Sequence, residues 1–60
     1  MLTPKEIREE LIKRGYDLTQ HSNPLSAIHG IVRSIRITKS KPKGSLSNII
    51  REILREAGEL

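Results

Sequence analysis

Aliphatic residues recur at helical spacing in three segments of this 60-residue chain, and this pattern constrains the fold more than any other feature. The segments span residues 4–14, 24–35 and 45–57. The chain contains one Tyr and neither Phe nor Trp, so its core must be aliphatic. A chain this short buries only about 60% of the surface that its unfolded form exposes. The sequence therefore predicts a single mostly all-α domain over residues 1–60, with three or four compact helices.

Capping residues mark the ends of the first helix. Thr3 is a good N-cap, Pro4 suits the first helical position, and Glu6 completes a Thr-x-x-Glu capping box. Gly15 is expected to end the helix. The predicted buried side consists of three aliphatic residues, Ile7, Leu11 and Ile12.

Two connections join the three segments. In residues 16–22, Asp17 is expected to cap a single turn, with a short strand as the alternative. Near residues 35–38 the alternation of apolar and polar residues leaves a second short strand open. Residues 39–44 are typical of a basic loop, and the last helix is expected to begin at Ser45 or Ser47.

The positive charge of the chain is concentrated in one block. The net charge is +4, yet no Asp or Glu occurs between Leu18 and Arg51. The bases of residues 21–45 are Arg33, Arg36, Lys39, Lys41 and Lys43. A solvated face usually mixes charges of both signs, whereas a site for a polyanion does not. The charge distribution therefore favours a nucleic-acid partner.

The second helix has a small outward face. Opposite its apolar stripe lie Ser26, Ala27, Gly30, Arg33 and Ser34. A glycine costs a helix about 1 kcal/mol relative to alanine, so a plain surface helix would carry another residue at position 30. Small side chains let a helix approach base edges in the major groove of DNA, where an arginine can bind guanine. We interpret this face as base-contacting; the alternatives are surface filler and close packing of another helix on Gly30.

A second group of residues is expected to contact the phosphates of the nucleic acid. The basic loop over residues 36–45 follows the candidate groove helix directly, and the start of the last helix offers free N–H groups beside lysines. The alternative for this loop is a solubilising surface segment. The candidate phosphate contacts of this segment are Arg36, Lys39, Lys41, Lys43 and Ser45. Two further candidates are Ser22, which precedes the second helix, and His29, at the border of its apolar stripe, where packing is the alternative.

No residue pattern indicates catalysis, a metal or a cofactor. The absence of cysteine excludes disulfides and thiolate metal sites. His21 and His29 lack neighbouring carboxylates, and no acid would orient His29 beside Ser26 as a catalytic pair. No apolar run approaches the ~20 residues of a membrane span. We therefore expect a protein that is not an enzyme, has no membrane partner, and is cytoplasmic, or nucleoid-associated if natural.

Residues 2–35 resemble helix-turn-helix domains of the winged-helix type. The run is LTPKEIREELIKRGYDLTQHSNPLSAIHGIVRSI, in which a capped helix leads through GYDL to an NPL-AIH recognition helix. The resemblance implies that residues 23–36 lie in the major groove and that Thr19, Gln20 and His21 contact the DNA backbone. A lysine loop and a helix then stand where a winged helix has a hairpin. The length and caps are also similar to computationally designed small helix-turn-helix DNA binders.

These observations lead to one functional hypothesis and one alternative. The hypothesis is sequence-specific binding of double-stranded DNA, as in transcription regulation, by a monomer or homodimer. The alternative is a small helical module that docks another protein, or a second copy, through the Gly30 face or the last helix.

Overall fold

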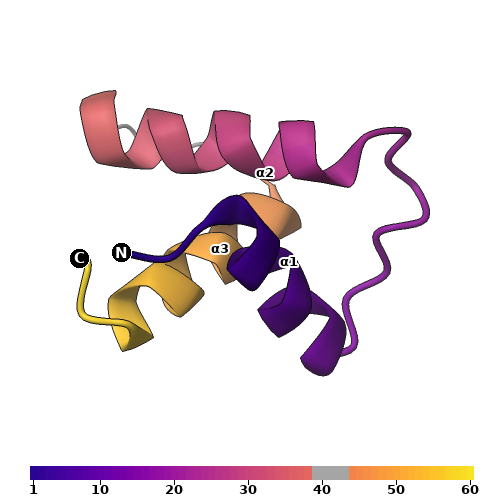
Figure 1. The fold of residues 1–60 in the computed structure, drawn as a ribbon, viewed down its shortest axis with the longest axis horizontal. Helices are drawn as coiled ribbons and strands as arrows, with labels where there is room; N and C mark the ends of the chain where they lie inside the picture. Colours follow the sequence, from indigo (N-terminus) through magenta and orange to yellow (C-terminus); the bar gives the residue numbers. More distant parts are fainter. Residues whose placement is uncertain (39–43) are drawn as a thin grey trace.

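The computed structural model describes residues 1–38 and 44–60. It contains the helices α1 (Pro4–Lys13), α2 (Pro24–Arg33) and α3 (Ser45–Glu56), and a π-helical turn, η1 (Ser34–Thr38), that continues α2. Each α-helix packs against the other two (Figure 1). The described ranges contain no strand, so the helical prediction is confirmed and the strand alternatives within residues 16–22 and 35–38 are wrong. No helix within these ranges has the length and apolar character that a bilayer crossing needs.

The predicted caps of α1 are confirmed. The Thr3 hydroxyl accepts a hydrogen bond from the Glu6 N–H at 3.2 Å, and the Glu6 carboxylate accepts one from the Thr3 N–H at 2.9 Å. At the other end Gly15 has a φ of +81°, and the N–H groups of Gly15 and Tyr16 donate to carbonyls of the last turn. This pairing is a Schellman motif, which requires the left-handed conformation that glycine adopts without strain.

The hydrophobic core is aliphatic and lies between the three helices. Its buried residues are Ile7, Leu11, Leu18, Ile28, Val32, Ile35, Leu46, Ile50, Ile53 and Leu54. One predicted core residue is wrong, because Ile12 is 58% exposed. At about 100° per residue, Leu11 lies only ~40° around the helix from Ile7, whereas Ile12 lies ~140° away. Ile12 therefore points outward from the same helix.

The connection between α1 and α2 is built on a turn at Asp17, as predicted. The Asp17 carboxylate accepts hydrogen bonds from the Thr19 hydroxyl at 2.6 Å and from the Thr19 N–H at 2.9 Å. These two bonds lower the pKa of Asp17. Leu18, between the two residues, is buried in the core and fixes the connection to the helices.

A cluster of polar contacts ties both ends of the chain to the end of α2. Arg36 in η1 donates to the Leu2 carbonyl at 3.1 Å and forms an ion pair with Glu59. The Leu2 N–H donates to the other Glu59 oxygen at 2.6 Å. The Leu2 amide and the Arg36 guanidinium lower the pKa of Glu59. This Leu2–Arg36–Glu59 clasp lies where both termini approach the η1 end of α2 (Figure 1).

Candidate nucleic-acid interface

Helix α2 presents one side to the core and the other to solvent. Asn23 is its N-cap, since the side-chain oxygen accepts a hydrogen bond from the Ser26 N–H at 3.2 Å, and Pro24 follows at the first helical position. Ile28 and Val32 are buried against α1 and α3. The opposite side of α2 lies on the outside of the three-helix arrangement (Figure 1).

The predicted base-contacting residues lie on this open side to different degrees. Ser26, Gly30 and Arg33 are exposed, whereas Ala27 and Ser34 are half-buried on one edge. A Cβ added at Gly30 would meet no atom within 4 Å. Packing by another helix within the described residues is therefore not the reason for the glycine.

Ile37 belongs to this surface but is not among the predicted contacts. Ile37 is 67% exposed although it is a large apolar residue. It follows Gly30 by seven residues, which places both on the same side of a helix. Helical spacing places Ile37 on the same side as Gly30 and Arg33, but this spacing applies only if residues 35–38 are helical. The sequence left a strand open there. We call Ser26, Gly30, Arg33 and Ile37 the outer α2 face.

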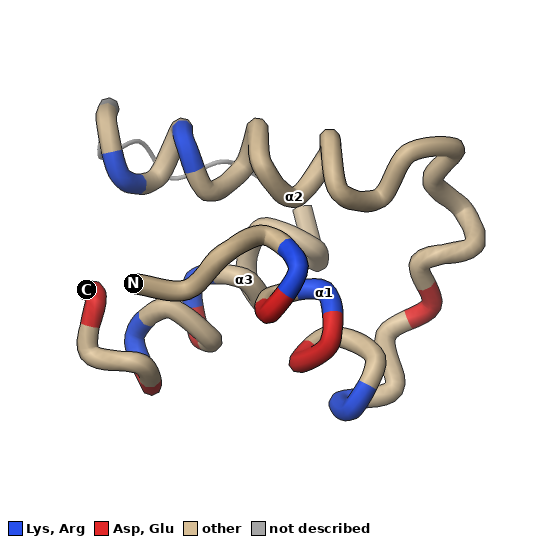
Figure 2. Tube along the Cα trace, viewed as in Figure 1, with Lys and Arg blue, Asp and Glu red and all other residues tan. Residues whose placement is uncertain are grey.

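The outer α2 face carries the positive charge of Arg33, and the acids lie elsewhere in the molecule. Within the described residues, Arg33 has neither an ion pair nor a side-chain hydrogen bond. The acids lie on α1, on α3, in the α1–α2 connection and at the C-terminal end of the chain, and none lies on α2 (Figure 2). Arg33 is exposed, and no acid of residues 1–38 and 44–60 forms an ion pair with it.

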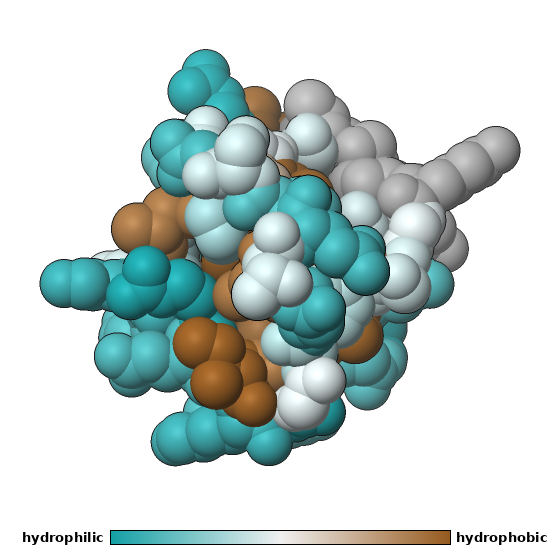
Figure 3. Space-filling model, turned by 90° about the vertical axis from the view of Figure 1, so that its right-hand side faces the viewer, coloured by the Kyte–Doolittle hydropathy of each residue, from teal (hydrophilic) through white to brown (hydrophobic). Residues whose placement is uncertain are grey.

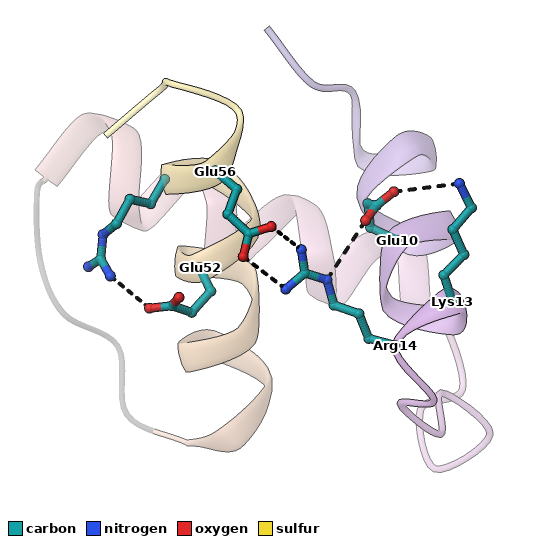
Figure 4. A network of polar contacts seen from close by, with 6 residues as sticks. Glu10, Lys13, Arg14, Glu52 and Glu56 are labelled. Atoms are coloured by element: carbon teal, nitrogen blue, oxygen red, sulfur yellow. Dashed lines mark hydrogen bonds and ion pairs between the residues drawn. The ribbon is translucent and has the colours of Figure 1, made fainter.

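The α1–α3 side of the molecule shows the opposite arrangement. Arg14 lies between two acids, with its guanidinium 2.5 Å from a Glu56 oxygen and 3.7 Å from Glu10 (Figure 4). The Arg14 guanidinium lowers the pKa of Glu56. Such exposed pairs stabilise a fold little, but they cancel the charge that a polyanion would meet. This side is therefore a poor phosphate surface.

Some candidate phosphate contacts remain accessible. Gln20, Ser22, His29 and Ser45 are exposed. Helix α3 begins at Ser45, which confirms one of its two predicted starts. Its N-cap is Gly44, which makes no side-chain capping hydrogen bond. The Ser45 hydroxyl lies 3.5 Å from the Tyr16 hydroxyl. Three further candidates, Lys39, Lys41 and Lys43, lie outside the described residues.

The other candidates have different partners in the structure. The Arg36 guanidinium belongs to the Leu2–Arg36–Glu59 clasp, which neutralises its charge inside the protein. The Thr19 hydroxyl donates to the Asp17 carboxylate, and His21 is half-buried. We therefore assign Arg36 and Thr19 to holding the fold rather than to phosphate binding.

A groove of about 380 Å³ runs beside the outer α2 face. It lies between the first four residues and the α2–η1 helix, and its helical wall consists of His29, Val32, Arg33, Arg36 and Ile37. No sequence pattern predicts this groove, because it forms only when the N-terminal segment packs beside α2.

The end of the molecule formed by the α1–α2 connection is mostly hydrophilic, with apolar side chains in separate spots (Figure 3). Among the residues that the structure describes, no three His, Asp or Glu side chains are grouped as a metal site would require.

No family model, curated protein or solved structure matches this chain. The assignment of a function therefore depends on the residues and geometry of the chain itself.

Proposed function

We propose that this protein binds double-stranded DNA with α2 in the major groove, in the manner of a helix-turn-helix domain. The observation that carries the proposal is the outer α2 face, which is open at Gly30 and bears Arg33, a residue without an ion pair among the residues that the structure describes. The major groove is wide enough for one α-helix. A helix with small residues at positions 26 and 30 can bring its backbone close to the base edges.

The residues of the face have separate roles in this proposal. Arg33 donates two hydrogen bonds to O6 and N7 of a guanine, which discriminates that base by about 1–3 kcal/mol. Ala27 and Ile37 offer apolar contact to thymine methyl groups, and Ser26 and Ser34 offer hydroxyls. Phosphate contacts come from exposed flanking residues and the basic segment, namely Gln20, Ser22, His29, Ser45, Lys39, Lys41 and Lys43. Such contacts position the helix but carry no sequence information.

The alternative of protein docking through α3 has little support. The apolar stripe of α3 is used inside the protein, where Leu46, Ile50, Ile53 and Leu54 are buried. The outer side of α3 instead carries ion-paired residues such as Arg55, whose guanidinium lies 2.7 Å from Glu52. A dimer through α3 would lack an apolar surface of its own.

The salt dependence of binding to duplex DNA tests the proposal. We expect the logarithm of the binding constant to fall linearly with the logarithm of salt concentration between about 50 and 200 mM. Arg33→Ala should reduce the preference between sequences, whereas Lys41→Ala should weaken binding to all sequences alike and lower the salt slope by about one. The matched control is Arg55→Ala, on the side of the molecule away from the outer α2 face. Equal losses for Arg33→Ala and Arg55→Ala, or no salt dependence, would contradict the proposal.

A further inference from the structure

The groove beside α2 has aliphatic walls and an open rim. Leu2 and Pro4 line one side, and Val32 and Ile37 line the other. Ile37 is 67% exposed, and Met1 at the edge is 96% exposed. The volume of about 380 Å³ falls within the range of about 300–1,000 Å³ typical of ligand pockets. The groove therefore has room for a large apolar side chain and leaves apolar surface uncovered in the described structure.

The charges around the groove indicate what kind of chain fits it. No acid lines the groove, and Arg33 at its rim is unpaired within the described residues. Arg36 is also in the lining, but its charge is balanced by Glu59. An occupant that complements this rim carries carboxylates next to its apolar side chain.

A second copy of the chain fits the groove less well. A two-fold interface uses the same surface patch of both copies. It would bring Arg33 of both copies into one interface, and no acid is among the described residues that line the groove. The charges therefore favour a different, acidic chain.

We propose that this groove docks an acidic peptide segment through one apolar side chain, and that the docked segment excludes DNA. Arg33 and Ile37 belong both to the groove and to the outer α2 face, so one surface cannot serve both ligands at once. The docking depends on the groove alone, whereas the exclusion rests on the proposed function.

Selection from a library of random displayed peptides of about twelve residues tests the docking without a known partner. Selection against the full chain is expected to enrich peptides in which a Leu, Ile, Met or Phe is flanked by Asp or Glu. A synthetic peptide of the enriched sequence should bind Ile37→Asp and Arg33→Glu about tenfold or more weakly than the wild type. Both positions are exposed, and circular dichroism checks that the variants fold.

The matched control for this experiment is Ile12→Asp. Ile12 is an exposed isoleucine at 58%, comparable with Ile37, but it lies on α1 outside the groove. It should leave peptide binding unchanged. The docking is overturned if no peptide is enriched, if the enriched peptides lack acids, or if Ile12→Asp weakens binding as much as Ile37→Asp.

Competition between the enriched peptide and a duplex DNA separates the two proposals. We expect the peptide to displace DNA, with the apparent dissociation constant for DNA rising in proportion to the peptide concentration. Binding of both ligands at once overturns the exclusion. Peptide binding by a protein that binds no duplex overturns the proposed function, and the exclusion with it, while the docking stands.

Discussion

Replacing Gly30 by alanine is expected to change the stability of the protein and its affinity for DNA in opposite directions. In a helix interior, glycine is less favourable than alanine by about 0.8–1.0 kcal/mol. The new methyl group meets nothing within 4 Å, so no steric cost offsets this gain. We therefore expect Gly30→Ala to stabilise the protein by about 1 kcal/mol, which corresponds to a rise of about 4–8 °C in Tm for a domain of this size.

The same substitution is expected to weaken DNA binding, because the methyl group lies between the helix backbone and the base edges. Gly30→Leu makes the contrast larger, since leucine also favours helix but adds more bulk at the same open position. A loss of about tenfold or more in affinity is expected for the leucine variant. The matched control is Glu9→Ala, at an exposed position of α1 away from α2. Thermal unfolding by circular dichroism and fluorescence anisotropy with a labelled duplex give the two quantities.

Two results would refute this reasoning in different ways. A lower Tm for Gly30→Ala would mean that some part of the protein packs closely on position 30. A higher Tm together with unchanged DNA affinity for both the alanine and the leucine variant would mean that DNA does not approach this side of α2.

Three further predictions concern the fold that holds this face. Ile50 has no exposed surface, so Ile50→Ala should cost about 2–5 kcal/mol, measured by urea denaturation. Thr3→Ala removes the hydroxyl of the capping box and should cost about 1 kcal/mol. The contacts with Leu2 and Arg36 lower the pKa of Glu59 from 4.5. The ionised Glu59 carboxylate therefore stabilises the fold above pH 4.5, and this stabilisation is lost as the pH falls through the lower pKa of the folded state. Glu59→Gln should therefore be less stable than the wild type at neutral pH and lose less stability on acidification.

Each of these predictions has a clear contrary result. Parallel stability profiles of the wild type and Glu59→Gln on acidification below about pH 4.5 would show that the Leu2–Arg36–Glu59 clasp is not formed in solution. Unchanged stability of Thr3→Ala would contradict the capping box, and unchanged stability of Ile50→Ala would contradict the core.

Features encoded by neighbouring residues were predictable from the sequence. The capping box at Thr3 and the glycine stop at Gly15 each depend on residues within one or two turns, and the structure confirms them. The exposure of Ser26, Gly30 and Arg33 follows from helical spacing and the position of the apolar stripe.

Features that depend on distant contacts were not predictable. Over residues 35–38 a short alternation fits both a strand and a helix, and periodicity alone does not decide between them. In the structure this segment is helical, and Arg36 finds its partners at Leu2 and Glu59, far away in the chain. Because Arg36 is paired with Leu2 and Glu59, it is not assigned to phosphate binding. The same contact holds the N-terminal segment beside α2, where the groove forms.

Chemical-shift perturbation of ¹⁵N-labelled protein by a duplex DNA tests the central claim most directly. The outer α2 face is predicted to be the surface that DNA contacts, so the largest shifts should occur at the amides of Ser26, Gly30 and Arg33, with smaller ones at Ser22 and Ser45. Shifts concentrated on the ion-paired α1–α3 side around Arg14 and Arg55, or no shifts at low salt, would contradict it.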